Sequence, residues 1–178
     1  ASHLGTTMDK TIRPDEMQSL VHLDCIDEDI TSIAGLQVFE NLQTLSLWEN
    51  NVDDLSPLEG LTQLKWLELG HNAIHDVGPL EGLTRVERLG LSSNELVDIT
   101  PLQGMANLQW LHLDNNAIQD ISPIASLNAL TWVTIEHNNV ANPESLDALL
   151  STGADVYFEN QTPLADPSAR AGLSDRLP

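Results

Sequence analysis

The sequence predicts an α/β solenoid built from a repeat of 22 residues. The repeat is clearest between Leu108 and Ala129, where the chain reads LQWLHLDNNAIQDISPIASLNA. Equivalent units begin at Leu20, Leu42, Leu64, Val86 and Leu130. The register holds without an insertion from Leu20 to about Ala141. A fixed period of this length indicates stacked units that share a continuous core, and a hydrophobic content of 41% is sufficient for one such domain.

Each unit opens with a short predicted strand. Counted from the start of a unit, positions 1, 4 and 6 are apolar, as at Leu64, Leu67 and Leu69, so alternate side chains point inward. Position 9 is asparagine in five successive units: Asn50, Asn72, Asn94, Asn116 and Asn138. We expect these amides to bond backbone groups that a turn leaves unpaired, which would form a ladder along the solenoid. Glu28 occupies position 9 of the first unit and predicts looser geometry at that end.

A short helical segment is predicted after each strand. Between Asp54 and Glu59, Ser56 is a candidate N-cap, Pro57 a first helical residue and Glu59 the reciprocal partner of a capping box. A single 3₁₀ or α turn is therefore expected there, and the unit that contains Pro101 repeats the arrangement. Aspartate recurs at position 13, where we expect it to cap these turns rather than bind metal. These residues are Asp54, Asp76, Asp98 and Asp120.

The two ends of the chain depart from the repeat. The predicted divisions are an N-terminal cap over residues 1–19, a repeat domain over 20–160 with a C-terminal cap from about 141, and a tail or linker over 161–178. Pro14 marks a helix start in the N-terminal cap. In the C-terminal cap a helix is predicted from Asn142 to about Leu150, closed by Gly153. A final short strand over residues 156–158 would then cover the open end of the core.

The repeat pattern resembles a known family. The pattern LxxLxLxxNxIxDIxPLxxL, which recurs with minor substitutions from Leu42, Leu64, Val86 and Leu108, is similar to the 22-residue leucine-rich repeat of bacterial internalin-like proteins. The resemblance covers roughly residues 20–160. It implies a curved right-handed coil with a parallel β-sheet on its concave face and short 3₁₀ or α segments on its convex side. It also implies a protein-binding module of a bacterial protein that is secreted or displayed on the cell surface.

The chain is strongly acidic, with 27 Asp and Glu residues against 7 Lys and Arg residues and a formal net charge of -20 at pH 7. Electrostatic repulsion argues against a nucleic-acid partner and against anionic membrane surfaces. Basic proteins, neutral glycans and metal ions remain compatible partners, and the charge also fits solubility or adaptation to high salt. No run of 18 apolar residues and no signal-peptide pattern occurs in the sequence, so no membrane insertion is predicted.

A single cysteine, Cys25, rules out a disulfide within the chain. It occupies position 6, where the other units carry leucine or isoleucine, so we expect it to be a buried structural thiol. A thiol in an apolar environment is unreactive, because burial disfavours the thiolate.

Positions 3, 5 and 7 of each strand point away from the core, onto the face we call the concave face. All four tryptophans lie there: Trp66, Trp110 and Trp132 at position 3 and Trp48 at position 7. Aromatic side chains gathered outside the core commonly mark an interaction site. Arg88, at position 3 between Trp66 and Trp110, could instead complete a self-stabilising cation–π ladder that has no ligand. The candidate ligand-binding residues are Trp48, Trp66, Arg88, Trp110, His112, Asp114, Trp132 and Glu136.

Two polar clusters are weaker candidates for metal binding. The first comprises His112, Asp114, Glu136 and His137, which lack the close ligand spacing of a transition-metal site. The second comprises Asp24, Asp27, Glu28 and Asp29, which lack the glycine and terminal glutamate of an EF-hand loop, although calcium stays an open alternative there. No phosphate-binding loop, nucleophile elbow, HExxH or CxxC occurs. The sequence therefore predicts no bound metal or cofactor, no catalytic residue and no enzyme activity.

Together these patterns predict a monomeric, non-enzymatic module that binds a protein through Trp66, Trp110 and Trp132 on the concave face. Basic residues on the partner would complement the acidic rim of that face. Glycan binding by the same tryptophans is the first alternative. The second is a structural spacer, without a ligand of its own, in a larger surface protein.

Overall fold

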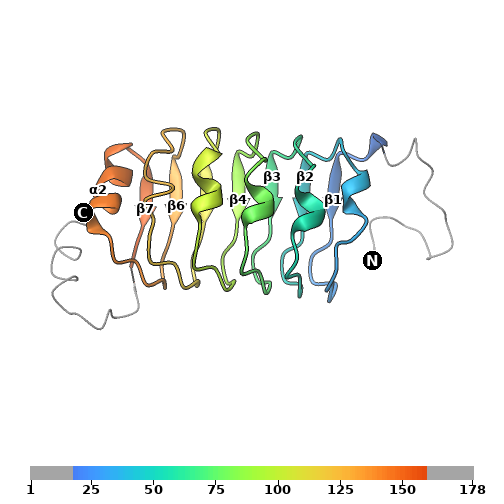
Figure 1. Ribbon diagram of the computed structural model, residues 1–178, viewed down its shortest axis with the longest axis horizontal. Coiled ribbons are helices and arrows are strands. Elements are labelled where there is room, and N and C mark those ends of the chain that lie inside the picture. Colours follow the sequence, from blue (N-terminus) through green and yellow to red (C-terminus); the bar gives the residue numbers. More distant parts are fainter. Residues whose placement is uncertain (1–17, 160–178) are drawn as a thin grey trace.

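A computed structural model of the chain describes residues 18–159. Within this range, seven strands lie side by side in one parallel sheet, in the order of the chain (Figure 1). They are β1 (His22–Asp24), β2 (Thr44–Ser46), β3 (Trp66–Glu68), β4 (Arg88–Gly90), β5 (Trp110–His112), β6 (Trp132–Thr134) and β7 (Asp155–Tyr157). Neighbouring strands pair equivalent positions of successive units, such as Leu67 with Leu89. The predicted solenoid with a parallel sheet is confirmed.

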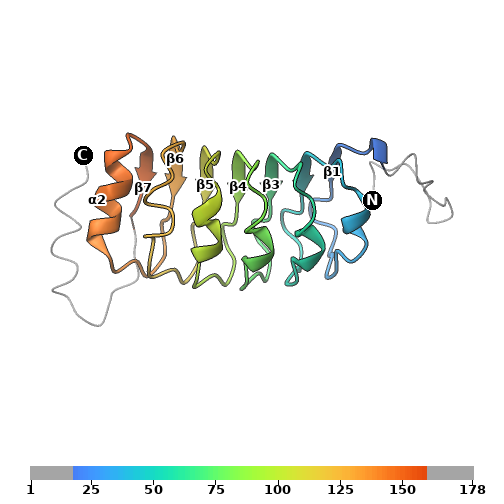
Figure 2. The same ribbon diagram turned by 45° about the horizontal axis from the view of Figure 1, so that its top comes forward.

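Short helices in the connections lie in a row on one side of the solenoid, as Figures 1 and 2 show. They are the 3₁₀ helices η1 (Leu36–Val38), η2 (Ser56–Leu58), η3 (Gly78–Leu80) and η4 (Thr100–Gly104), and the α-helix α2 (Pro143–Ser151). The connection after β5 keeps Ser122 and Pro123 but forms turns without a helix. The strands and the helices therefore occupy opposite sides of a shared core, and the sheet leaves one face for contacts outside the molecule.

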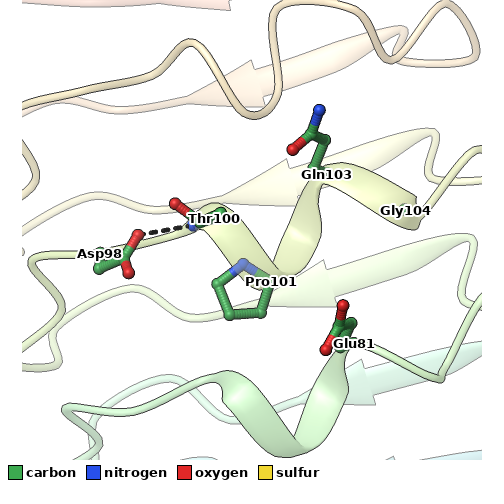
Figure 3. Close-up of a pocket in the computed structure, with 6 residues that line it drawn as sticks. All are labelled: Glu81, Asp98, Thr100, Pro101, Gln103 and Gly104. Carbon is green, nitrogen blue, oxygen red and sulfur yellow. Dashed lines mark hydrogen bonds between the residues drawn. The ribbon is translucent and has the colours of Figure 1, made fainter.

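The capping of the 3₁₀ helices differs from the predicted capping box. Ser56 is the first residue of η2 rather than its N-cap, and Glu59 is the C-cap, whose N–H donates to the Ser56 carbonyl. Instead, the Oδ1 atom of Asp54 accepts the Ser56 N–H at 2.9 Å. Asp98 accepts the Thr100 N–H in the same way at 2.8 Å (Figure 3). The remaining pairs of this kind are Asp76 with Gly78 and Asp120 with Ser122. The roles predicted for Ser56 and Glu59 are thus wrong, because an aspartate two residues upstream reaches the first N–H of the helix, and the capping role predicted for the aspartates is confirmed.

The core runs along the solenoid and contains the side chains predicted at positions 1, 4 and 6, for example Leu64, Leu67 and Leu69. The asparagine ladder is also confirmed. The Asn94 Oδ1 atom accepts the Ile74 N–H at 3.0 Å. The Asn94 Nδ2 atom donates to the carbonyl oxygens of Leu69, Leu91 and Ser92 at 3.0, 3.1 and 3.3 Å. Each such side chain joins two adjacent units and so holds their turns in register.

The first described unit departs from the others. Glu28 stands in place of the ladder asparagine, and its N–H donates to the Oδ1 atom of Asn50 in the next unit at 3.2 Å. Asp29 has a φ of 54°, in the left-handed region, whereas the positive φ of Asp27 recurs at the equivalent position of the next five units, as at His71. Cys25 is only partly buried, which contradicts the predicted full burial, because β1 is the edge strand of the described sheet. Burial nevertheless raises the pKa of the Cys25 thiol and disfavours the reactive thiolate.

The elements predicted near the C-terminal end are present. Asn142 is the N-cap of α2, Gly153 follows the helix with a φ of 85°, and β7 adds a last strand before the buried side chain of Phe158. Residues 1–17, which include the predicted helix start at Pro14, and the tail over 161–178 lie outside the described residues, so the division of the chain into domains stays a prediction. In residues 18–159 no helix has the length and apolar character needed to cross a membrane.

Candidate functional site

A row of large side chains occupies position 3 of the consecutive strands β3 to β6. Trp66 pairs with Arg88, Arg88 with Trp110, and Trp110 with Trp132 in the register of the sheet. The Arg88 Cζ atom lies 5.8 Å from the centroid of the Trp66 ring and 4.5 Å from that of Trp110. The rings of Trp110 and Trp132 stack, with centroids 6.2 Å apart and planes inclined by 26°. Four of the predicted site residues are therefore brought together as the sequence indicates.

Tyr157 extends this row, although the repeat pattern does not predict it as a site residue. Its ring centroid lies 4.6 Å from that of Trp132. One extra residue precedes β7, so Trp132 pairs with Asp155 and Tyr157 falls at the outward position opposite Thr134. Alternation of inward and outward side chains from Asp155 to Tyr157 is the sequence signal for this position, although the sequence pattern alone predicts only that this strand covers the end of the core. We call Trp66, Arg88, Trp110, Trp132 and Tyr157 the aromatic ladder.

The aromatic ladder is ordered by its own contacts and still open to solvent. Trp66 is 47% exposed, Trp110 40% and Tyr157 44%. Trp132 is partly buried between its two ring neighbours. Side chains this large bury most of their surface when they serve a core, so the exposed fractions leave apolar area available for a partner.

Trp48 does not belong to the ladder and lies instead in a separate polar pocket of about 360 Å³. The residues that line this polar pocket are Trp48, Glu68, His71, Ser92, Ser93, His112, Asp114 and Asn115. They come from positions 5, 7 and 8, at and just beyond the carboxyl ends of β2 to β5. The Trp48 and His71 rings contact each other, with centroids 4.5 Å apart and planes at 55°. The concave face therefore has two parts, the aromatic ladder and the polar pocket.

Two glycines make room for the walls of the polar pocket. A Cβ atom on Gly70 would lie 2.4 Å from Cζ3 of Trp48 and 3.1 Å from Oε1 of Glu68. A Cβ atom on Gly90 would lie 2.0 Å from that same oxygen. The Trp48 ring and the Glu68 carboxylate thus occupy space that side chains at positions 70 and 90 would fill.

The acidic groups of the polar pocket differ in their surroundings. Glu68 accepts the Gly70 N–H at 3.1 Å, yet burial raises the pKa of its carboxyl group. Asp114 is held by several donors. Its Oδ1 atom accepts the Glu136 N–H at 3.0 Å, and its Oδ2 atom accepts the hydroxyl groups of Ser92 and Thr134. Asp114 is therefore fixed in place, whereas the charge of Glu68 is compensated only in part.

The two remaining predicted site residues, His112 and Glu136, relate differently to the polar pocket. His112 lines the polar pocket, and its Nδ1 atom is 3.1 Å from the Thr134 hydroxyl oxygen. Glu136 touches the network through its backbone N–H and does not line the polar pocket. Among residues 18–159, no group of three or more His, Cys, Asp or Glu side chains is placed to hold a metal ion. The structure thus adds no support for a metal at either polar cluster considered from the sequence.

A second hollow, of about 520 Å³, lies on the helical side of the solenoid (Figure 3). It is lined by Glu81, Asp98, Thr100, Pro101, Gln103 and Gly104. Asp98 and Thr100 already serve the turn, since hydrogen bonds from the side chain and N–H of Thr100 lower the pKa of the Asp98 carboxyl group. Because these two residues cap η4, the larger volume of the hollow does not make it the better candidate site.

The geometry of the repeat defines a leucine-rich repeat protein, and comparisons with known proteins agree. Residues 40–96 match the leucine-rich repeat family. Internalin C2 of Listeria monocytogenes is 34% identical, with a TM-score of 0.79, and the alignment covers 90% of this chain and 70% of internalin C2. The chain therefore belongs to the internalin-like leucine-rich repeat proteins.

More distant structures share the fold. An internalin InlF of Listeria monocytogenes is 23% identical with a TM-score of 0.70, over 96% of this chain and 63% of InlF. A leucine-rich repeat protein of Leptospira interrogans is 20% identical with a TM-score of 0.66, over 90% of this chain and 48% of that protein. None of the curated proteins compared with the sequence matches it. The internalin-like fold suggests a protein-binding module, without naming the binding face.

Proposed function

We propose that this chain binds a protein partner through its concave face, with the aromatic ladder as the central contact. The observation that carries the proposal is the partial exposure of Trp66, Trp110 and Tyr157 in a single row outside the core. Tryptophan, tyrosine and arginine are the residues most enriched in the energetic centre of protein interfaces. The ladder contains these three residue types and no others.

The ladder is also preorganised. Arg88 lies against the rings of Trp66 and Trp110, and Trp132 lies between Trp110 and Tyr157. These contacts limit the rotamers of the side chains before a partner arrives, so less conformational entropy is lost on binding. Neighbouring strands are about 4.8 Å apart, so β3 to β7 span roughly 19 Å, which is enough for the edge of a folded partner.

Charge supports a basic partner. The chain carries a formal net charge of -20. Glu68, Asp114 and Glu136 lie on the same face as the ladder, beyond the tryptophans toward the carboxyl ends of the strands. Basic residues around an apolar patch on the partner would match this arrangement and speed association.

The aromatic ladder fits a glycan ligand, or a spacer without a ligand, less well. A glycan-binding platform needs an aromatic face on which a sugar ring can lie, but Arg88 and Trp132 contact Trp110 from the strands on either side. This geometry favours a protein, which can use ring edges as well as faces. A spacer without a ligand would leave exposed aromatic surface unused. We propose a monomeric module with no catalytic role, and the family resemblance supports a bacterial protein that is secreted or carried on the cell surface.

The test compares capture of partners by the full chain and by Trp110→Ala. Val97→Ala is the matched control, because Val97 is an exposed apolar residue outside the strands. A captured protein is purified and its Kd measured directly. We expect Trp110→Ala to weaken binding at least tenfold, about 1.4 kcal/mol, and Val97→Ala to change it less than twofold.

A glycan array run with the same three proteins separates the alternatives. Glycan signals that Trp110→Ala abolishes would support the glycan-binding module in place of the protein-binding one. Silence on the array, together with no protein whose binding depends on Trp110, would support the spacer and overturn the proposal.

A further inference from the structure

We propose that the polar pocket receives a cationic side chain, lysine or arginine, from the protein partner. The inference rests on the protein-binding function proposed above and adds a chemical requirement on the partner. It concerns residues that do not belong to the aromatic ladder, among them Trp48, Glu68 and His71 at positions 7, 5 and 8 of their units. Its support comes from the shape, the charge and the aromatic wall of the polar pocket.

The shape depends on the absence of two side chains. Most units place a side chain at positions 5 and 7, but the third and fourth units have glycine at Gly70 and Gly90. The Glu68 carboxylate occupies the space that a Cβ atom on Gly90 would need, and the Trp48 ring occupies the space that a Cβ atom on Gly70 would need. The carboxylate and the ring thus approach a common point beside Gly70, within 3.1 Å and 2.4 Å of its missing Cβ. Both groups line the polar pocket, so a cation within the polar pocket can contact the carboxylate and the ring.

The charge of the polar pocket is incompletely balanced by the chain itself. Glu68 and Asp114 contribute two carboxyl groups, and none of the lining residues is lysine or arginine. Arg88 is held over the rings of Trp66 and Trp110, so its guanidinium group belongs to the ladder. His71 and His112 are the lining groups that can carry positive charge, and they lower the pKa of Glu68 less than burial raises it. A cation from outside would stabilise the ionised carboxylate where burial disfavours it.

The aromatic wall selects a cation over a neutral polar group. The ring of Trp48 is half-buried against Gly70 and is held by His71 at 4.5 Å between centroids. Indole is the strongest cation–π partner among the aromatic side chains, and the attraction grows when water is excluded. Asp114 adds a fixed carboxylate, since Ser92, Thr134 and the Glu136 N–H hold both of its oxygens. A carboxylate, an indole and a second carboxylate around one cavity form a receptor for lysine or arginine.

The probe for the experiment is N-acetyl-lysine methylamide, and the neutral control is N-acetyl-norleucine methylamide, which lacks the ammonium group. Both are titrated into the full chain while NMR follows the indole signal of Trp48 and the ring signals of His71 and His112. We expect the lysine probe to shift these signals with a saturable profile and the norleucine probe to leave them unchanged. N-acetyl-arginine methylamide is expected to act as the lysine probe does.

Two variants disturb the polar pocket without removing a core side chain. Glu68→Gln removes the charge, and Gly90→Ala keeps the charge but pushes the carboxylate aside, because the new Cβ would stand 2.0 Å from Oε1. The matched controls are Glu81→Gln and Gly82→Ala, both exposed and next to η3. We expect at least fivefold weaker binding of the lysine probe by the first two variants and less than twofold change for the controls. Unchanged backbone spectra verify the fold of each variant.

Three results would overturn the inference: equal shifts with the norleucine probe, undiminished binding by Glu68→Gln and Gly90→Ala, or the same shifts produced by calcium chloride at matched ionic strength. The last result would indicate a metal site instead. A chain that binds its protein partner through Trp110 but ignores the lysine probe would overturn this inference alone. A chain that binds the probe but no protein would overturn the proposed function and leave the cation site standing.

Discussion

The guanidinium carbon of Arg88 lies 4.5 Å from the centroid of the Trp110 ring, on the neighbouring strand of the sheet. The two residues occupy equivalent positions of successive units, so the repeat itself sets them side by side. The contact orders Trp110 without burying it, since 40% of the side chain stays exposed. Order and exposure in one side chain are what separate an interaction surface from a core.

Trp110→Ala should lower the free energy of unfolding much less than Leu111→Ala. Trp110 loses one cation–π contact and one ring contact, together about 1–2 kcal/mol. Leu111 is fully buried, and its truncation leaves a cavity that costs roughly 2–5 kcal/mol. Urea denaturation followed by circular dichroism measures both values. Equal losses in the free energy of unfolding would indicate that the aromatic ladder stabilises the fold, and would favour the spacer over the binding module.

Asn94→Ala should be among the most destabilising polar substitutions in the chain. Its amide bonds the Ile74 N–H and three carbonyl oxygens in the interior of the turn. Each buried backbone group left without a partner costs about 1–3 kcal/mol, so we expect a total loss of at least about 3 kcal/mol. The unfolding midpoint in urea measures the loss. Asn128→Ala, at an exposed position, is the control and should change stability by less than about 0.5 kcal/mol.

Much of this fold could be predicted from the sequence, because one register assigns every residue to a face. Once Leu67 is placed inward, the outward position of Trp66 and the place of Asn72 in the asparagine ladder follow from the 22-residue period. The same register predicts that Arg88 lies beside Trp110. Stacking in one dimension makes neighbours in space predictable from a fixed offset in sequence.

Three features of the structure depart from the sequence prediction, each for a physical reason. The capping box predicted at Ser56 is wrong because Asp54 accepts the Ser56 N–H that the longer side chain of Glu59 was expected to accept. Tyr157 was missed because one extra residue before β7 moves it out of the register. The sequence pattern does not predict the polar pocket, because the polar pocket depends on the absence of side chains at Gly70 and Gly90. The pattern of outward residues does not show that the side chains of Trp48 and Glu68 occupy the space above these glycines.

Raising the salt concentration should stabilise the chain. A formal charge of -20 on 178 residues produces repulsion that is greatest in the compact state, and salt screens it over about 10 Å at 0.1 M and 3 Å at 1 M. We expect the Tm to rise by roughly 3–6 °C between 20 mM and 1 M sodium chloride, equivalent to about 1–2 kcal/mol for a domain of this size. Differential scanning calorimetry measures the change. A Tm that stays level in both sodium and potassium chloride would exclude self-repulsion as a significant term.

Glu68→Gln should become more stabilising as the pH rises. Burial raises the pKa of Glu68 above its ordinary value of 4.5, so at pH values between the ordinary and the raised pKa the folded state keeps a proton that the unfolded state releases. Such a group lowers stability as the pH rises through and above that ordinary value, and below it the penalty disappears. The free energy of unfolding of Glu68→Gln relative to the parent chain should therefore increase from pH 4 to pH 7. His71 and His112 share the polar pocket with Glu68 and are unchanged in this comparison.

Asp98→Asn should show the opposite dependence, which makes it the matched partner of the Glu68 variant. Hydrogen bonds from the Thr100 side chain and N–H lower the pKa of Asp98 below its ordinary value of 3.8. Its charge therefore contributes stability above that value, and the contribution is lost as the pH falls through the lowered pKa. Asparagine keeps the acceptor oxygen and removes only the charge, so the variant should be less stable than the parent at pH 7 and approach it under acid. Urea titrations at a series of pH values measure the free energy of unfolding of each variant relative to the parent chain. If this difference changed with pH in the same direction for both variants, the result would contradict the contrast between a buried carboxylate on the concave face and an exposed one at a helix start.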